Sequence, residues 1–344
     1  MAESDRRRPL QVLLLSDGLP GHGNQARGLV NWLRSRYQLE CHEQEVRLRL
    51  RPLARLLMPW LLRLGRPGAG LVRCFYRLDS TPVGVPDLIV SAGGNTSFLN
   101  VALARLKGVP NVFLGSKRRL RSDDFSAHLT LQPTGEPHNI VMELVPTLTD
   151  VEAQREAGDA LRRELGVEAG EKLYALVIGG NGAGFAYDEA SWQQLTRLAT
   201  ELAQRDRCRW LLTTSRRTGS AGEAVLRTSL DGQLLAAAVW WHEAPRKVMN
   251  AYLGAADAVL VTADSMSMIN ECIASGKPTL LLEPPGAQPD ARYRGALERF
   301  VAADYCRHHR LGEPLPALGW QAPANQAIRS RLLDVLEQQL ALDS

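Results

Sequence analysis

Short, continuous apolar runs that end in glycine, serine or aspartate recur along the chain, and segments with helical periodicity separate them. Continuous apolar runs are typical of parallel strands buried on both faces, and their alternation with helices predicts an α/β fold. A strand that leads into a glycine-rich turn occurs near residue 18 and again near residue 178. The predicted strands fall within residues 11–18, 86–94, 109–116, 173–184, 208–219, 256–265 and 277–284.

The repeated start of this pattern predicts two doubly wound, Rossmann-like domains that face each other across a cleft, with one large sheet as the alternative. A polar, charged segment at residues 146–152 marks the boundary. We therefore expect one domain over residues 1–148 and a second over residues 149–324. Residues 325–342 have the pattern of an amphipathic helix, and we expect the segment 325–344 to pack back on the first domain.

Composition adds limits on the class of protein. The chain has 344 residues, of which 45% are hydrophobic and 23% charged, which is typical of a folded, soluble protein. The net charge of +4 is too weak to indicate nucleic acid binding and suits an anionic ligand or a membrane surface. The 5 cysteines form no CxxC pair, which favours the reducing cytosol over a disulfide framework or a zinc site.

No uncharged run approaches the roughly 20 residues that span a bilayer, and the apolar stretch at residues 10–15 is too short for a signal peptide.

One segment departs from the alternating pattern. Residues 46–77, "VRLRLRPLARLLMPWLLRLGRPGAGLVRCFYR", are rich in leucine and arginine and contain no acidic residue. Pro52 and Pro59 interrupt the segment, so we do not expect one long helix. Basic and apolar residues without acidic ones suit the surface of an anionic bilayer. The alternative is a helical insertion whose leucines pack in the first domain while its arginines face water.

The glycine-rich breaks all follow predicted strands, where ligands bind in open parallel sheets. In "GGNGAG", residues 179–184, Gly179, Gly180 and Asn181 suit a diphosphate cradle, because glycine lets the backbone approach a ligand. The stretch has neither the GxGxxG nor the GxxxxGK[ST] spacing, so it indicates neither of those nucleotide motifs. A flexible turn is the alternative.

Two further strand ends in the second half carry polar residues. In "TTSRRTG", Ser215, Arg216 and Arg217 suit a phosphate clamp, with a solvated basic turn as the alternative. In "VTADSMSMINECIASGKP", residues 261–278, Asp264 or Ser265 is expected to cap a helix. A polar stripe of that helix includes Asp264, Ser267, Glu271 and Ser275, whose spacing places them on one face. The Glu271 carboxylate can accept two hydrogen bonds from a ribose diol, and solvent exposure of the face is the alternative.

The first half carries a candidate base. In "SDGLPGHGNQARGL", residues 16–29, His22 lies in the expected turn with Asp17, Asn24 and Gln25. An imidazole suits a general base that deprotonates an attacking hydroxyl, and Asp17 is either a competing base or the group that orients His22. A structural loop histidine is the alternative. In "SAGGNTSFLN", residues 91–100, we expect a helix to start after the two glycines. The residues at this start would either bind an acceptor or only cap the helix.

Four of these motifs together resemble the mitochondrial fission (elongated-mitochondria) family of plants and bacteria over most of the chain. In chain order they are "SDGLPGHGNQARGL", "SAGGNTSFLN", "TTSRRTG" and "VTADSMSMINECIASGKP". The resemblance implies a GT-B glycosyltransferase fold in which the second domain holds a nucleotide-sugar donor. More distantly, the first and last motifs are similar to the N-acetylglucosaminyltransferase that makes the lipid-linked peptidoglycan precursor. That resemblance matches Gly21 and His22 to a Gly-Gly-His turn, and Glu271 to a donor-ribose ligand before Gly-x-Pro. Plant members are linked to recruitment of a fission dynamin, whereas bacterial relatives are taken to be surface-polysaccharide or lipopolysaccharide glycosyltransferases.

We interpret the sequence as a metal-independent, inverting GT-B glycosyltransferase without a cofactor, located in the cytoplasm and peripherally at the inner face of the cytoplasmic membrane. The expected partners are a nucleotide-diphosphate sugar and a lipid-linked or surface-glycan (lipopolysaccharide-type) acceptor, and no nucleic acid. The alternatives are a non-catalytic, membrane-associated scaffold and a nucleotide-sugar epimerase, which shares the fold but needs acidic groups on both sides of the sugar. Candidate catalytic residues are His22 and Asp17; candidate donor-binding residues are Gly179, Gly180, Asn181, Ser215, Arg216, Arg217, Asp264, Ser265, Ser267 and Glu271; candidate acceptor-binding residues are Gly21, Asn24, Gln25, Gly94, Asn95 and Thr96.

Overall fold

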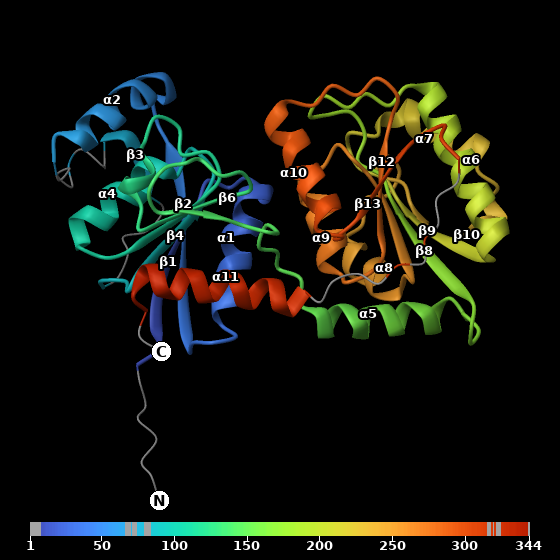
Figure 1. The fold of residues 1–344 in the computed structure, drawn as a ribbon, viewed down its shortest axis with the longest axis horizontal. Coiled ribbons are helices and arrows are strands. Elements are labelled where there is room, and N and C mark those ends of the chain that lie inside the picture. The colour runs from blue at the N-terminus through green and yellow to red at the C-terminus, as the bar shows by residue number, and fades with distance from the viewer. Residues whose placement is uncertain are drawn as a thin grey trace, which may run out of the picture. The chain divides into compact units, whose positions relative to one another are not determined.

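The chain forms two compact α/β units, each built around its own largely parallel sheet, in a computed structural model (Figure 1). Unit 1 contains Met1–Leu148 and Gln326–Ser344, and unit 2 contains Thr149–Asn325. Two sheets confirm the predicted α/β class and exclude the alternative of one large sheet. The structure describes residues 8–65, 70, 74–78, 84–314, 318, 320 and 325–342.

Unit 1 has a 7-stranded sheet in the order β3-β2-β1-β4-β5-β6-β7. Every neighbouring pair is parallel except β2 and β3. The order reverses between β1 and β4, so the switch point of a doubly wound sheet lies there. The elements are β1 (Leu10–Ser16), α1 (Pro20–Leu33), β2 (Leu39–Leu48), α2 (Arg51–Arg63), β3 (Tyr76–Leu78), β4 (Leu88–Ala92), α4 (Ser97–Lys107), β5 (Asn111–Leu114), the 3₁₀ turn η1 (Ser122–Asp124), β6 (Ala127–Thr130), β7 (Asn139–Val141) and α11 (Asn325–Leu340).

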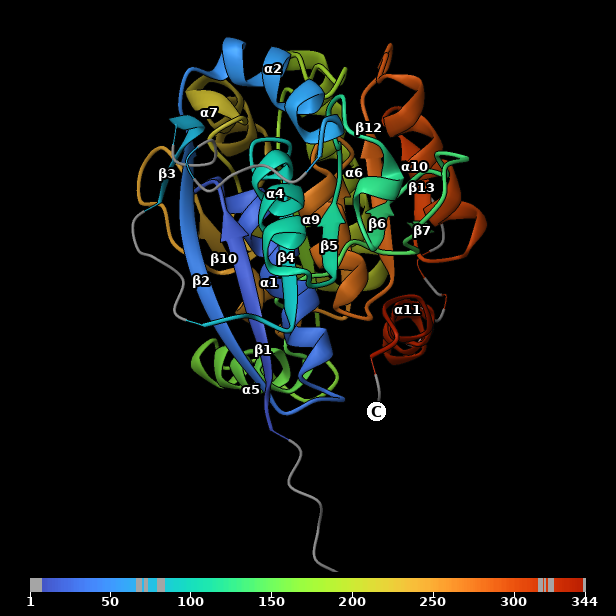
Figure 2. The same ribbon diagram turned by 90° about the vertical axis from the view of Figure 1, so that its left-hand side faces the viewer.

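Helices cover both faces of the unit 1 sheet, which is why its central strands β1 and β4 contain continuous apolar runs. Along β1, Val12 and Leu14 pack in a core that α1 and α11 complete. Leu13 and Leu15 pack in the opposite core, which α2 and α4 complete. Figure 2 shows α4 lying over β4, and Figure 1 shows α11 lying beside α1. An ion pair of 2.6 Å also links Glu337 of α11 to Arg36, which follows the end of α1.

The expected turn at residues 16–25 is shorter than the sequence analysis predicted. The helix α1 begins at Pro20, whose fixed φ suits the first helical positions, so His22, Asn24 and Gln25 lie in the helix. The expectation that His22 sits in a loop is therefore wrong. The first turn of α1 still lies directly after the end of β1, so the imidazole remains at the edge of the sheet.

The basic segment at residues 46–77 divides between β2, α2 and β3. Pro59 lies inside α2 instead of ending it. The neighbouring residues Met58 and Leu62 are buried against α4 in the core, and this packing offsets the lost helical hydrogen bond. Arg66 and Arg73 of the segment lie outside the described residues.

Unit 2 has a 6-stranded sheet in the order β10-β9-β8-β11-β12-β13, with every pair parallel. Its order reverses between β8 and β11. Gly158 of α5 lies against Gly254 of α8, where a Cβ on Gly158 would come within 2.2 Å of the partner backbone. The elements are α5 (Val151–Glu164), β8 (Lys172–Val177), α6 (Glu189–Asp206), β9 (Cys208–Thr213), α7 (Gly219–Ser229), the 3₁₀ turn η2 (Gly232–Leu234), β10 (Leu235–Val239), α8 (Met249–Ala255), β11 (Ala258–Thr262), α9 (Met266–Ala274), β12 (Thr279–Glu283), α10 (Ala291–Ala302) and β13 (Arg307–Arg310).

Candidate functional site

The candidate residues gather at the switch point of each sheet, at the carboxyl ends of the strands. In unit 1, Asp17 follows β1 and the Gly93-Gly94 turn follows β4, which is the hydrogen-bonded neighbour of β1. In unit 2, Gly179 follows β8 and Asp264 follows β11, which is the hydrogen-bonded neighbour of β8. Each unit therefore brings together motifs that are distant in sequence, at the position where open α/β sheets bind ligands.

In unit 1, three predicted residues form one hydrogen-bonded cluster. His22 Nδ1 lies 3.1 Å from Asp17 Oδ2. The side-chain amide of Asn95 donates to the same Asp17 oxygen at 3.2 Å. The Asp17 side chain is 3% exposed, whereas the His22 side chain is 38% exposed. A buried carboxylate at Nδ1 orients the ring and leaves Nε2 free to accept a proton from solvent-side groups.

Two side chains contact the Gly93-Gly94 turn, one at each glycine. A Cβ on Gly93 would lie 2.1 Å from His22 Nδ1, and a Cβ on Gly94 would lie 2.2 Å from Arg118 Nε. Gly93 has φ +85, a backbone conformation that favours glycine. Arg118 follows β5, the neighbour of β4, and the sequence analysis missed it. The three cations of "SKRRL" directly after a predicted strand were the available signal.

The remaining acceptor candidates are less closely grouped. Gly21 and Asn24 are exposed on the first turns of α1, and Gln25 is half-buried. The buried hydroxyl of Thr96 donates to the carbonyl of Gly93 at 2.9 Å, which indicates a structural part in the turn. Thr96 does occupy the N-cap position of α4, as predicted.

In unit 2, the glycine-rich turn closes tightly around the buried carboxylate of Asp264, which pairs with Arg217. Asp264 Oδ2 lies 2.6 Å from the Arg217 guanidinium, and the Asp264 side chain is 0% exposed. Gly179 leaves room for this carboxylate, because a Cβ there would lie 2.4 Å from it. Gly180 has φ +132, and a Cβ there would lie 2.2 Å from the Arg217 carbonyl oxygen. Burial raises the pKa of the Asp264 carboxyl, while the Thr262 hydroxyl and Arg217 oppose that rise.

Several of the predicted phosphate ligands hold the turn itself. The hydroxyl of Ser215 donates to the Gly179 carbonyl, which also accepts from Thr218 Oγ1 at 2.8 Å. Asn181 Oδ1 accepts from the backbone N–H of Tyr187 at 2.7 Å. These contacts fix the loop, so its backbone and Arg216 are left to meet a ligand.

Arg216 and the start of α9 offer positive potential at this edge. Arg216 is exposed and has no hydrogen-bond or ion-pair partner among the described residues. Ser265 occupies the N-cap position of α9, but its own side chain makes no capping hydrogen bond to the backbone N–H groups that follow. Uncapped N–H groups at a helix N-terminus attract anions. The Ser265 and Ser267 hydroxyls lie 3.4 Å apart at the same end.

Glu271 lies on α9, about 8 Å along the helix axis from the first residue of the helix, since an α-helix rises 1.5 Å per residue. Its side chain is half-buried, and within the described part of the chain its carboxylate has no hydrogen-bond or ion-pair partner. Burial raises the pKa of this carboxyl. A desolvated carboxylate without partners is a destabilising feature, which is typical of a binding site that a ligand completes.

Two tyrosines that the sequence analysis missed hold the turn between β11 and α9. Tyr187 OH donates to the Leu282 carbonyl at 2.7 Å and accepts from the Ala263 N–H at 3.0 Å. Tyr293 OH donates to the Ala263 carbonyl at 2.9 Å. The backbone next to Asp264 is therefore fixed from two sides.

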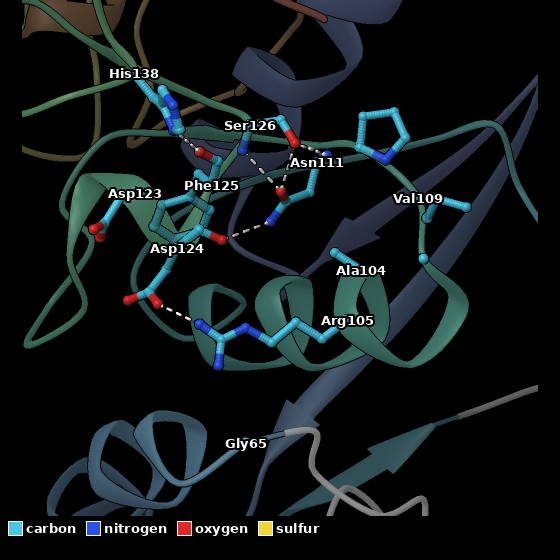
Figure 3. A pocket seen from close by; sticks show the side chains of 12 residues that line it. Gly65, Ala104, Arg105, Val109, Asn111, Asp123, Asp124, Phe125, Ser126 and His138 are labelled. Atoms are coloured by element: carbon cyan, nitrogen blue, oxygen red, sulfur yellow. Dashed lines mark hydrogen bonds and ion pairs between the residues drawn. The ribbon is translucent and has the colours of Figure 1, made fainter.

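A separate pocket of about 710 Å³ lies in unit 1 at the amino end of β5, away from the strand ends that carry His22 (Figure 3). Most of the labelled polar groups in Figure 3 bind one another, and Asp123 pairs instead with Arg121, which is not drawn. Arg105 pairs with Asp124 at 2.5 Å, and Asn111 Oδ1 accepts from the Ser126 N–H at 2.9 Å. His138 Nδ1 lies 2.8 Å from the Phe125 carbonyl. We therefore do not assign the predicted reaction to this pocket.

Within the part of the chain that the structure describes, no helix has the length and hydropathy needed to cross a bilayer. Four expectations from the sequence stay predictions: a cleft between the domains, the roles of the site residues, the absence of a metal and the absence of a cofactor.

Comparisons with known proteins identify both a family and a fold. The family model described as Mitochondrial fission ELM1 matches residues 20–332. No curated protein sequence matches the chain. The UDP-GlcNAc 2-epimerase of Methanocaldococcus jannaschii is similar in structure, with a TM-score of 0.53 and 11% identity over 96% of this chain and 99% of that chain. The ADP-heptose lps heptosyltransferase II of E. coli gives a TM-score of 0.47 and 12% identity over 96% of this chain and 99% of that chain.

The likeness to the archaeal epimerase confirms the predicted GT-B fold. At this level of identity, the likeness extends to the fold alone.

Proposed function

We propose that this chain, which belongs to the mitochondrial fission ELM1 family, is a glycosyltransferase that moves a sugar from a nucleotide-diphosphate sugar to an acceptor at a membrane surface. The observation that carries the proposal is the half-buried Glu271 carboxylate, which has no partner among the described residues and lies on a helix whose N-cap side chain makes no capping hydrogen bond. A nucleoside diphosphate supplies both missing partners, because its ribose diol donates hydrogen bonds and its phosphates accept them.

The donor half of the reaction belongs to unit 2. The N–H groups at the start of α9 and the guanidinium of Arg216 would neutralise the diphosphate, and Glu271 would hold the ribose. Arg217 is already paired with Asp264, so we assign it the structural role of holding the turn in shape. Preorganised donors of this kind stabilise a leaving diphosphate without a metal ion.

The acceptor half belongs to unit 1. His22 Nε2 would take the proton of the acceptor hydroxyl as its oxygen forms a bond to the anomeric carbon. The bond from that carbon to the diphosphate breaks, and the diphosphate leaves with the electron pair. Asp17 holds His22 through Nδ1 and stabilises the imidazolium that results. This single displacement inverts the anomeric configuration.

The position of the acceptor is suggested by α2, which begins just after β2 ends and so starts at the same edge of the sheet, the carboxyl ends of the strands, as His22. Figures 1 and 2 both show α2 at one end of unit 1. Its outer surface exposes large apolar side chains: Leu50 is 65% exposed, Trp60 59% and Leu64 67%, with Leu53 and Leu56 beside them. This is the exposed apolar pattern of the membrane hypothesis, although Met58 and Leu62 pack inward as the alternative requires.

We assign an anionic bilayer surface to this face, which we call the α2 face (Leu50, Leu53, Leu56, Trp60 and Leu64). Charge complementarity supports this occupant, because Arg51, Arg55 and Arg63 are exposed on the same helix and no acidic residue occurs from 46 to 77. Apolar side chains beside arginines bind the boundary between headgroups and acyl chains.

Co-sedimentation with phosphatidylcholine vesicles, with and without phosphatidylglycerol, tests the α2 face. The double variant Leu56→Ser, Trp60→Ser should lose binding to the anionic vesicles. Val335→Ser, which alters an exposed valine on α11, is the matched control and should bind as the wild type does. Equal binding by the double variant would refute this assignment.

Calorimetric titration with UDP, ADP and GDP tests the donor half. We expect at least one diphosphate to bind, Arg216→Ala to weaken it, and Arg197→Ala, an exposed arginine of α6, to leave it unchanged. A transfer assay with the matching nucleotide sugars and a membrane lipid extract then tests the reaction. Sugar conversion without an acceptor would indicate an epimerase instead, and no binding of any diphosphate would indicate a scaffold.

A further inference from the structure

We propose that Arg118 forms, beside His22, a binding site for a phosphate group of the acceptor. This inference deepens the proposed function and rests on it, because it names the chemistry of the second substrate. Phosphate fits the site because the planar guanidinium fork binds two phosphate oxygens at once.

The geometry places Arg118 where an acceptor must lie. The Arg118 side chain lies along the Gly94 backbone, and the His22 ring lies against the adjacent Gly93. The two side chains therefore flank a single turn at the switch point of unit 1. A phosphate at Arg118 would hold the rest of the acceptor next to the imidazole.

Arg118 is also available for a ligand. It is exposed and has no hydrogen-bond or ion-pair partner in the described part of the chain. Its neighbour Lys117, by contrast, is paired with Glu136 at 2.5 Å. Arg118 has φ +63, an uncommon backbone conformation for a bulky residue, and such strain concentrates at functional positions.

The same turn has a second unfilled group. Asn95 Oδ1 is buried and accepts no hydrogen bond from the described residues, although the Asn95 amide donates to Asp17. A buried acceptor without a donor is costly unless a ligand supplies one. An acceptor hydroxyl adjacent to a phosphate would supply it. The N-terminus of α4, directly after this turn, adds a positive dipole end.

The test follows the imidazole signal of His22 by NMR, because this readout reports on unit 1 alone. The signal is assigned by its loss in His22→Gln. One arm titrates inorganic pyrophosphate, and a second arm titrates phosphatidylcholine vesicles with and without phosphatidic acid. The variants are Arg118→Ala, Arg118→Lys and, as the matched control, Arg119→Ala, which removes an exposed neighbouring arginine.

We expect a saturable response in the wild type and in Arg119→Ala, an affinity at least about tenfold weaker in Arg118→Ala, and an intermediate affinity in Arg118→Lys. A response to pyrophosphate supports a free phosphate group, and one to phosphatidic acid vesicles alone supports a lipid phosphate. The proposal is overturned if neither probe moves the wild-type signal or if Arg118→Ala responds as the wild type does.

UDP binding, measured on the same samples, separates the two hypotheses. Retained UDP binding without any response at His22 overturns only the Arg118 site. A response at His22 that depends on Arg118, without binding of any nucleoside diphosphate, overturns only the proposed transferase.

Discussion

Unit 1 and unit 2 share one backbone plan at their switch points but treat their ionisable groups in opposite ways. In unit 1, the His22 side chain is 38% exposed and Arg118 stands free of partners among the described residues. In unit 2, Asp264 is 0% exposed and locked to Arg217, and Glu271 is half-buried. The same strand-turn-helix arrangement therefore carries accessible groups in one unit and desolvated groups in the other.

This difference matches two different tasks. A proton-transfer group must reach its substrate and exchange protons, so exposure of His22 suits chemistry. A site that recognises a diol and a diphosphate gains strength from desolvated, fixed groups, since hydrogen bonds to charged groups are stronger away from water. We infer that unit 1 contributes chemistry and acceptor recognition, and that unit 2 contributes donor binding.

The largest effect should come from removing the base in unit 1. We expect His22→Gln to lower the transfer rate by about 10²–10⁴-fold, the usual contribution of general base catalysis, while UDP binding stays unchanged. His42→Gln, an exposed histidine of β2, is the control. Steady-state transfer assays and calorimetry measure the two quantities. A weaker binding of UDP with an unchanged rate would reverse the assignment of tasks to the units.

The comparison also shows which parts of the fold the sequence could predict. The central strands, such as β1 and β11, are buried on both faces and appear as continuous apolar runs, so they were predicted. Edge strands lack that signal, because one side of the strand has no neighbour. The edge strand β13, with the sequence Arg-His-His-Arg, was missed for this reason. β2 lies between β3 and β1 and was missed for a different reason, because its buried positions alternate with exposed ones.

The candidate site was predictable only where its residues are close in sequence. The pairing of His22 with Asp17 follows from their position after one strand, and the sequence analysis weighed that pairing. The contact of Arg118 with Gly94 depends on the order of β4 and β5 in the sheet, which local patterns do not give. The pairing of Arg217 with Asp264 likewise depends on strand order.

The next largest effect should come from Glu271 in unit 2. We expect Glu271→Gln to weaken UDP binding by about 10- to 100-fold, because an ionised acceptor is worth about 1.5–3 kcal/mol at a hydrogen bond. The same variant should melt at a higher temperature at pH 7, since it removes a desolvated charge. Calorimetry and thermal denaturation measure the pair of effects. A variant that loses binding and stability together would indicate a structural role for the carboxylate.

The pH dependence of that stability has a defined sign. Burial raises the pKa of Glu271 above its ordinary value of 4.5, so the native state binds more protons than the unfolded state between the two values. Stability of the wild type therefore falls as pH rises through this window, and the loss is complete above the native pKa. The stabilisation by Glu271→Gln should grow from pH 4.5 upward and then stay constant. Urea denaturation across this pH range measures it.

Glycine substitutions compare the rigidity of the two turns. Gly180→Ala should cost more than about 2 kcal/mol of unfolding free energy, because its Cβ would meet backbone of the neighbouring turn at a positive φ. Gly93 also has a positive φ, but Gly93→Ala should cost less, because its Cβ would meet the side chain of His22 and not backbone. It should lower transfer by displacing that ring. Gly21→Ala, a helical position with no atom within 4 Å, should stabilise by up to about 1 kcal/mol. Equal costs at Gly93 and Gly180 would contradict this contrast.

The smallest effect should separate two adjacent arginines of unit 2. Arg217→Ala leaves the buried Asp264 carboxylate without its cation, so we expect a loss of about 1–2 kcal/mol in urea denaturation. The value stays modest because Arg217 is itself 38% exposed, and solvent screens part of the pairing. Arg216→Ala removes an exposed group without partners in the described chain and should change stability by no more than about 0.5 kcal/mol. Asp264→Asn should restore stability in the Arg217→Ala background, because it removes the unpaired charge. If the two arginine variants lose the same stability, the ion pair does not hold the turn, and the contrast between a fixed donor site and an accessible base loses its basis.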